Sequence, residues 1–260
     1  MKVLFIGDVI GNPGRKAIKS LLKDFVQENS VDLVIANGEN AAGGFGITES
    51  VAEELFYNGI DAITSGNHIF DKKDVLTYLD RSDRLIRPLN YPEDVPGKGV
   101  TVFTVNSTKV AVLNISGLVF MTPIRCPFRT IDAELAKLPD DIKVKIVDFH
   151  AEVTSEKSCM GWYLDGRVSA VLGTHTHTPT ADARVLPKGT AFITDVGMTG
   201  PYDSVIGVHK DSAMRRFLLQ MPTRFTTATG DIRLCGALVT VDVSTGKSLA
   251  IERIELRMDV

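Results

Sequence analysis

The sequence predicts an α/β protein made of two packed mixed sheets with helices on their outer faces. In the first 80 residues, short apolar runs typical of buried strands alternate with segments in which apolar residues recur at helical spacing. After that point the pattern changes to short strands separated by turns, with few helices. A parallel sheet from the front half and a β-rich back half fit together when two sheets pack face to face.

The front half is expected to form βαβ units. The expected strands are Lys2–Ile6, Asp32–Ala36 and Ala62–Ser65, and the expected helices are Lys16–Gln27, Thr48–Asn58 and Asp71–Asp80. In the first helix, the apolar residues from Ile18 to Val26 recur at a spacing that forms one apolar face. Asp71 is a suitable N-cap for the third helix, because its carboxylate can accept a hydrogen bond from the first turn.

The back half is expected to consist mainly of antiparallel pairs and short strands. The expected strands are the hairpin Val100–Val105 and Lys109–Ile115 around Asn106-Ser107-Thr108, then Val144–Phe149, Val168–Leu172 and Thr190–Thr194, and the closing pair Ala237–Val243 and Ser248–Leu256. Arg81–Gly99 is rich in proline and charge, and we expect a long surface loop there. Because no repeat, low-complexity segment or linker is visible, residues 1–260 are expected to form a single domain.

Composition narrows the class of protein. Hydrophobic residues make up 44% of the 260 residues, which suits a large core, and the net charge of −3 argues against a nucleic-acid-coating protein. The opening segment is too short and too soon acidic for a signal peptide, and no apolar run is long enough for a membrane helix. Three widely spaced cysteines form no CxxC pair. We therefore expect a cytoplasmic protein that contacts no membrane.

Five short motifs stand at or just after the ends of expected strands, where α/β sheets carry their chemistry. They are Gly7-Asp8-Val9-Ile10-Gly11, Asn37-Gly38-Glu39-Asn40, Ser65-Gly66-Asn67-His68, Asp148-Phe149-His150-Ala151-Glu152 and Gly173-Thr174-His175-Thr176-His177. Two histidines one residue apart point to the same side of an extended segment, and imidazole is the commonest transition-metal ligand. Carboxylate, amide and imidazole donors without thiolate suit manganese, iron or zinc. The motifs together indicate a metal site.

A site for two ions needs a bridging carboxylate and about 3.5–4 Å between the ions. Glu39 is the natural bridge, with Asp8 completing one ion, Asn67 the other, and the three late histidines divided between them. His68 follows a ligand directly, so its side chain should point elsewhere and remain free for proton transfer. Taken singly, each motif also has a structural interpretation as a turn, a cap or a buried histidine. His209 is expected to be solvated.

Three other segments allow more than one interpretation. Trp162-Tyr163-Leu164 is more typical of packing than of a platform for a base, although a nucleotide pocket could use it. The loop Gly43-Gly44-Phe45-Gly46 either shapes the substrate mouth or is an ordinary connection. Asp195–Asp203, which contains Gly197, Gly200 and Pro201, could line the pocket because its composition is similarly typical of a loop.

The order of the five motifs resembles that of the calcineurin-like metallophosphoesterases. Two departures from the broad pattern, Asp8-Val9-Ile10 in place of Asp-x-His and Gly38-Glu39 in place of Gly-Asp, are the pattern of the YmdB-like branch. The stretches Ile6–Arg15, Ala36–Gly44 and Gly173–Thr180 look very like that branch, as does Asp195–Pro201. The similarity extends over essentially the whole chain.

The resemblance implies a four-layer α/β/β/α sandwich and a dinuclear phosphodiesterase. One ion would be held by Asp8, Glu39, Asn40 and His177, and the other by Glu39, Asn67, His150 and His175. His68 would be the catalytic acid for hydrolysis of 2′,3′-cyclic nucleotides to the 3′-phosphate, with a hydroxide held between the ions as nucleophile. Iron or manganese is implied, and zinc also fits the donors.

Some alternatives stay open at this stage. A phosphomonoesterase or 3′,5′-cyclic nucleotide phosphodiesterase would use the same donors, and a regulatory RNA- or protein-binding protein could retain a vestigial metal site. The expected partners are small cyclic nucleotides and RNA ends, and we expect a homo-oligomer.

Overall fold

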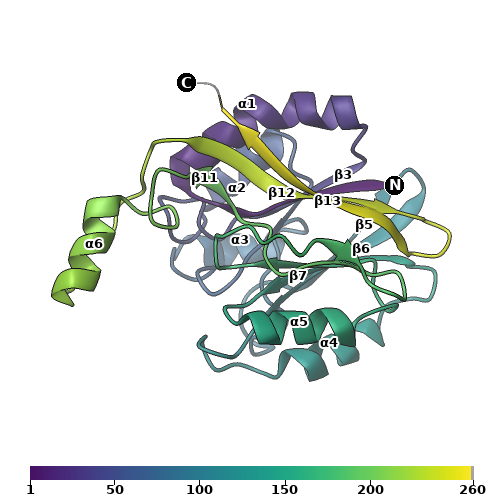
Figure 1. Cartoon of the computed structure of the whole chain (residues 1–260). Coiled ribbons are helices and arrows are strands. Elements are labelled where there is room, and N and C mark those ends of the chain that lie inside the picture. The colour runs from purple at the N-terminus through teal and green to yellow at the C-terminus, as the bar shows by residue number, and fades with distance from the viewer. Residues whose placement is uncertain (259–260) are drawn as a thin grey trace.

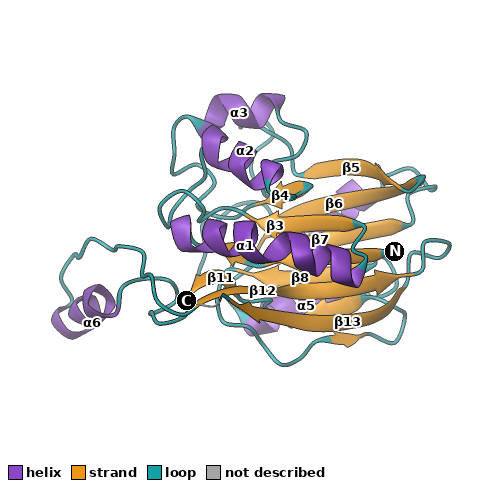
Figure 2. Ribbon diagram, turned by 90° about the horizontal axis from the view of Figure 1, so that it is seen from above, coloured by secondary structure: helices purple, strands orange, loops and turns teal. Residues whose placement is uncertain are grey.

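The computed structural model describes residues 1–258 and consists of two mixed sheets packed face to face. Helices cover the outer face of each sheet, so that Figure 1 shows four layers: helix α1, one sheet, the other sheet, and helices α4 and α5. The predicted α/β/β/α sandwich is therefore confirmed. Helix α6 projects away from these layers in both Figure 1 and Figure 2.

The first sheet combines the front of the chain with its last strands. Its path runs β2-β11-β12-β1-β3-β4, and β13 pairs with β12. The strands are β1 (Lys2–Ile6), β2 (Asp8–Val9), β3 (Leu33–Asn37), β4 (Ala62–Thr64), β11 (Met198–Pro201), β12 (Ile232–Val241) and β13 (Ser248–Arg257). Strands β1, β3 and β4 are parallel, as βαβ units require, whereas β12 lies antiparallel to β1.

The second sheet has the order β5-β6-β7-β8-β10-β9. Its strands are β5 (Val100–Val105), β6 (Thr108–Ser116), β7 (Val144–His150), β8 (Ala170–Thr174), β9 (Arg184–Val185) and β10 (Ala191–Ile193). The four central strands are parallel, and an antiparallel strand closes each edge. The predicted hairpin between β5 and β6 is present, and Asn106 and Ser107 adopt the left-handed conformations that a tight hairpin turn uses.

Six helices connect or cover the strands of the described residues. They are α1 (Gly11–Asn29), α2 (Glu49–Tyr57), α3 (Val75–Arg81), α4 (Pro127–Leu135), α5 (Thr154–Tyr163) and α6 (Lys210–Leu219). Thr48 caps α2 by accepting a hydrogen bond from the Val51 backbone N–H. No helix within residues 1–258 combines the length and apolar character needed to cross a bilayer.

Three apolar clusters hold the layers together. The central cluster lies between the sheets, where Phe5 and Ile35 of the first sheet belong to the same buried group as Val112 and Leu172 of the second. A second cluster joins α1 and α2 to the first sheet, and a third joins α4 and α5 to the second. Both faces of the central strands are covered in this way, which agrees with the nearly continuous apolar runs in the sequence, whereas β5 and β13 keep exposed residues.

Three predictions about local structure were wrong. The third helix begins at Val75 rather than Asp71, so Asp71 does not cap it. The back half contains α4, α5 and α6, although few helices were expected there. The Arg81–Gly99 segment is irregular but is not all surface, because Leu85 and Ile86 are fully buried and Ile86 belongs to the central core.

Candidate metal centre

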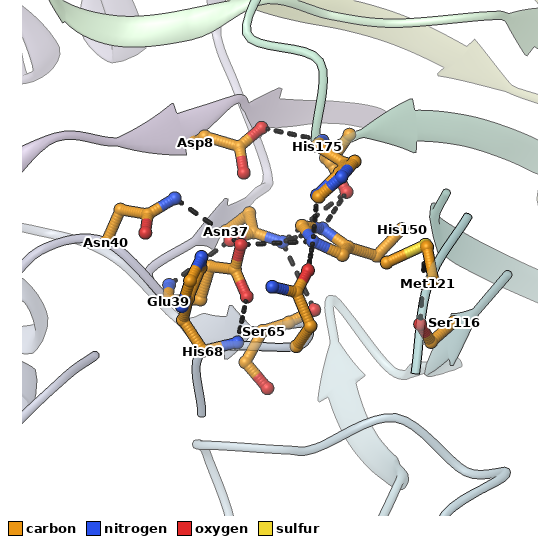
Figure 3. A network of polar contacts seen from close by, with 12 residues as sticks. Asp8, Asn37, Glu39, Asn40, Ser65, His68, Ser116, Met121, His150 and His175 are labelled. Carbon is orange, nitrogen blue, oxygen red and sulfur yellow. Dashed lines mark hydrogen bonds and ion pairs between the residues drawn. The ribbon is translucent and has the colours of Figure 1, made fainter. Parts of the chain in front are cut away.

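The five predicted motifs meet at one edge of the sandwich, at the carboxyl ends of β1, β3, β4, β7 and β8. Figure 3 shows Asp8, Glu39, Asn40, His150 and His175 facing one another across the gap between the two sheets. Parallel strands end on the same side of a sheet, so residues distant in sequence gather here. The structure brings together all seven side chains that the sequence nominated as ligands.

Four donor atoms converge on one point around His150. Its Nε2 atom lies 3.0 Å from Glu39 Oε1, 3.0 Å from Asn67 Oδ1 and 3.0 Å from His175 Nδ1. One imidazole nitrogen carries at most one hydrogen, so it cannot satisfy three such neighbours by donating. Facing lone pairs from carboxylate, amide and imidazole fit a transition-metal ion. Glu39, His150 and His175 also satisfy the geometric requirement for a three-residue metal site.

A second group of donors lies on the other side of Glu39. The Asn40 amide Nδ2 is 3.2 Å from His177 Nε2 and 3.4 Å from Glu39 Oε1, and His177 Nε2 is 3.8 Å from Asp8 Oδ1. Turning the amide by 180° would place Asn40 Oδ1 toward these groups. Asp8 Oδ1 is fully buried and has no hydrogen-bond partner among the residues that the structure describes. An orphaned buried carboxylate oxygen is costly unless a cation satisfies it, so this group also fits a metal.

The buried charges of the centre shift one another's pKa values. Burial alone would raise the pKa of Glu39, but the facing His150 imidazole and the His68 backbone N–H outweigh it and lower that pKa to about 2. Burial also opposes protonation of His150, yet the surrounding carboxylates, led by Glu39, raise its pKa to about 9. Burial raises the pKa of Asp8 against the opposing effect of His177 and His150. The carboxylates therefore create a strong local attraction for positive charge.

His175 responds in the opposite direction. Burial, followed by the neighbouring His150, lowers the pKa of His175 to about 3, so its ring is neutral at physiological pH. A neutral imidazole is the form that binds a metal. Its second nitrogen, Nε2, lies 3.1 Å from Glu152 Oε2 at the surface of the site. That carboxylate orients the ring and leaves Nδ1 directed inward.

Buried polar groups fix the orientation of His150. Its Nδ1 atom lies 2.8 Å from the Thr174 hydroxyl, which donates to Asp148 Oδ1 at 2.7 Å. Asn37 donates to the other Asp148 oxygen at 3.0 Å. Burial raises the pKa of Asp148 to about 7. Gly66 allows the close approach of the ring, because a Cβ there would lie 2.2 Å from His150 Nε2.

The backbone that carries His175 and His177 is strained. Both residues have positive φ angles, 98° for His175 and 64° for His177, which residues other than glycine rarely adopt. A buried ion pair holds this segment: Lys157 Nζ donates to Asp195 Oδ2 at 2.7 Å and to the Thr174 carbonyl at 2.6 Å. The same Asp195 oxygen accepts from the backbone N–H and the hydroxyl of Thr176. The strained conformation is therefore maintained by contacts with its surroundings.

His68 lies beside the donors but points differently from Asn67, as predicted. Its backbone N–H donates to Glu39 Oε2 at 2.9 Å, and its ring Nδ1 lies 2.8 Å from Asp71 Oδ2. Phe45 contacts the ring edge-on with 5.1 Å between centroids. The other ring nitrogen, Nε2, remains available on a side chain that lines the site cavity. This is the arrangement of a general acid held by a carboxylate.

A cavity of about 290 Å³ opens over the donors. Gly43, Gly44 and Phe45 line it, which favours the first of the two interpretations of this loop, that it shapes the mouth. Asp195–Asp203 does not line it, because Asp195 lies beneath the histidine segment and the following strand β11 is buried. The next segments take that place: Ile206–Val208 and Phe225–Thr227, which flank helix α6. Trp162 lies outside the cavity on α5, and His209 is exposed at the start of α6.

Sequence reasoning missed several residues that support the centre. Lys157, Glu152 and Thr174 were given no role, Asp195 was considered only as pocket lining, and Asp71 was taken for a helix cap. Asp148 and Glu152 belonged to the quoted motif around His150, so their acidic character was a usable signal. Lys157 gave none, since a lone lysine in a polar segment is normally exposed.

Residues 4–254 match the family model described as YmdB-like protein. The chain is similar to the 2′,3′-cyclic-nucleotide 2′-phosphodiesterase of Bacillus subtilis (strain 168), with 47% identity over 259 residues covering 100% of this chain and 98% of the relative. It is also similar to the crystal structure of a novel phosphatase from Mycoplasma pneumoniae, with TM-score 0.94 and 38% identity over 99% of this chain and 93% of that chain.

A more distant similarity supports the fold alone. The crystal structure of a 5′-nucleotidase from Candida albicans SC5314 superposes with a TM-score of 0.59 at 12% identity, covering 99% of this chain and 51% of that chain. The two-sheet sandwich is thus shared well beyond the range in which the sequences are recognisably alike.

Proposed function

The chain belongs to the YmdB-like protein family, and we propose that it is a metal-dependent phosphodiesterase that hydrolyses 2′,3′-cyclic nucleotides to the 3′-phosphate. The observation that carries the proposal is the convergence of Glu39, Asn67 and His175 on the Nε2 atom of His150, each at 3.0 Å. Such a cluster of electron-pair donors is stable when a cation lies among them. The name of the Bacillus subtilis relative supports the choice of substrate.

The seven donors divide into two ligand sets that share Glu39. Asp8, Glu39, Asn40 and His177 would hold one ion, and Glu39, Asn67, His150 and His175 would hold the other. When bound, two such ions stabilise charge on the phosphoryl oxygens and activate the attacking water. The unpartnered Asp8 Oδ1 atom supports the first set, and the crowding around His150 supports the second.

His68 serves as the acid of the reaction. Its ring Nδ1 lies 2.8 Å from Asp71 Oδ2, which fixes the ring, and Nε2 would carry the transferable proton on the side chain that lines the cavity. That proton passes to the departing 2′ oxygen as the bond between phosphorus and this oxygen breaks, so the phosphate stays on the 3′ oxygen. A positioned acid of this kind typically contributes about 10²–10⁴-fold to the rate.

The remaining expectations are part of the same proposal. Residues 1–260 act as a single metallophosphoesterase domain. The native ions are iron or manganese, because the amide oxygen of Asn40 stands in place of a histidine and is a harder donor, which favours these metals over zinc. RNA ends that carry a 2′,3′-cyclic phosphate are a second class of substrate. Free Cys126, Cys159 and Cys235 agree with a reducing cytoplasm. The exposed apolar side chains of α6, which include Phe217 and Leu218, favour a homo-oligomer.

The test compares hydrolysis of 2′,3′-cAMP, 3′,5′-cAMP and an aryl phosphodiester by chelated protein reconstituted with manganese, iron or zinc. We expect the 2′,3′-cyclic substrate to be converted to the 3′-phosphate, activity to be lost in Asp8→Ala, and the exposed His209→Ala variant to match the wild type. His68→Ala should keep both ions and lose turnover. Activity on the aryl diester alone would leave only a general phosphodiesterase. Full ion occupancy without activity on any substrate would instead indicate a binding protein with a vestigial site.

A further inference from the structure

One wall of the cavity is apolar, and its side chains supply neither a metal ligand nor a proton to the proposed reaction. Beside the donors the cavity is lined by Phe45 from the glycine-rich loop, by Phe225 after helix α6, and by Ile206 and Val208 before that helix. Phe45 is 38% exposed and Phe225 is half-buried. Keeping large apolar side chains open to solvent beside a polar centre is unfavourable unless a ligand covers them.

The two phenylalanines belong to segments that contact each other. Thr227 Oγ1 donates to the Gly43 carbonyl at 3.4 Å, which joins the segment carrying Phe225 to the loop carrying Phe45. The loop is itself anchored, since the Gly44 N–H donates to the Asn40 carbonyl at 3.1 Å. The loop that carries Phe45 is thus joined directly to the proposed ligand Asn40, and the segment that carries Phe225 is joined to that loop.

The charges around the cavity restrict the ligand. Among the described residues that line it there is no lysine or arginine, and its charged carboxylates are Glu39 and Glu152; the Arg216 guanidinium lies near the wall, 5.5 Å from the centroid of the Phe225 ring. A ligand that fits this wall has an apolar, preferably planar, surface. A nucleobase has these properties, because every base presents a π-face and stacks on aromatic side chains without a need for charge.

We propose that Phe45 and Phe225 form a nucleobase-binding rim at the mouth of the cavity. This inference rests on the proposed function, which places a cyclic phosphate at the donors, and it adds how the rest of the nucleotide is recognised. The rim selects for the presence of a base and tolerates its identity, with purines bound more tightly than pyrimidines because their stacking surface is larger. Phe45 also contacts the His68 ring, so the base lies next to the proposed acid.

The test separates the base from the phosphate. Phe45→Ala and Phe225→Ala are compared with wild type on 2′,3′-cAMP and on glycerol 1,2-cyclic phosphate, which carries the same reacting group without a base. We expect KM for 2′,3′-cAMP to rise about 10-fold in each variant, with no such rise for the glycerol substrate. An effect of Phe45 through His68 would lower kcat for both substrates alike. Phe120→Ala removes an equally large ring that is 90% exposed and outside the cavity, and serves as the matched control.

A binding measurement gives a second readout that needs no turnover. Calorimetric titration of adenosine into the wild type should show binding that weakens by about 10-fold in either rim variant and stays unchanged in Phe120→Ala. Equal adenosine affinity in all variants, or equal changes in KM for both substrates, would overturn the rim. Failure to hydrolyse either cyclic phosphate, with adenosine binding still dependent on Phe45 and Phe225, would refute the proposed function and leave the rim intact.

Discussion

Replacing Lys157 with methionine should destabilise the protein strongly, although the ammonium group of this residue bonds to Asp195 and to the Thr174 carbonyl and not to a proposed ligand's side chain within the described residues. Lys157 is 1% exposed, and it pairs with Asp195, which is fully buried. The substitution keeps most of the apolar stem but leaves the Asp195 carboxylate without its cation. It also removes the donor to the Thr174 carbonyl, next to His175.

The size of the effect follows from this burial. Removing one partner of a buried ion pair costs about 3–5 kcal/mol, since the remaining charge is neither paired nor solvated. For a chain of this length, each kcal/mol shifts Tm by roughly 2 °C, so Tm should fall by about 6–10 °C. The solvent-exposed pair between Lys109 and Asp141, at 2.7 Å, is the matched control. Exposed pairs contribute about 0–1 kcal/mol, and Lys109→Met should shift Tm by about 2 °C or less.

The assay is thermal unfolding of chelated protein, which keeps ion binding out of the comparison. The double variant Lys157→Met/Asp195→Asn should recover part of the loss, because it also removes the uncompensated charge. Unfolding of Lys157→Met at the same temperature as Lys109→Met would contradict the expected cost of the unpaired carboxylate. That result would mean that water or a rearrangement compensates Asp195 without cost.

Three further outcomes are expected. In Gly173→Ala the new Cβ would lie 1.7 Å from the Thr194 carbonyl oxygen. The free energy of unfolding in urea should therefore fall by more than about 4 kcal/mol. An unfolding midpoint equal to that of the wild type would contradict this close approach. Manganese at 100 times its Kd should stabilise the chelated protein by about 2.7 kcal/mol, which is measured as a rise in Tm. The Tm of Asp8→Ala should rise less. Asp71→Asn should lower kcat by less than the ~10²–10⁴-fold expected for loss of His68, with both ions retained by metal analysis; loss of ions would make Asp71 part of the metal site instead.

The strands and the clustering of the candidate ligands were largely predictable from the sequence, for related physical reasons. Strand β1 was expected at Lys2–Ile6 and is found there, because a strand buried on both faces is a continuous apolar run. Polar residues that directly follow such runs stand out, and parallel topology gathers them at one edge. The positions of Glu39 and His150 could therefore be anticipated, whereas the division of donors between two ions came from family resemblance.

The features that were missed depend on contacts between distant residues. Helix α5 was not predicted, since Thr154–Tyr163 has a weak apolar periodicity and is stabilised by packing on the second sheet. The role of Lys157 depends on Asp195, 38 residues away. Asp71 looked like a cap because an acidic residue before a helical pattern usually is one, yet His68 provides a closer partner.

The place of β12 in the first sheet has a consequence for synthesis of the protein. This strand, Ile232–Val241, lies between β11 and β1, and Lys2 is paired with Thr240. The first strand to be synthesised therefore pairs on this side with one of the last strands to be synthesised. While a ribosome is still elongating the chain, β1 and β3 can pair, but one edge of β1 stays open. The sheet that carries Asp8 and Glu39 thus closes only after most of the chain has emerged, and until then its exposed edge is a substrate for chaperones and for misassembly between nascent chains.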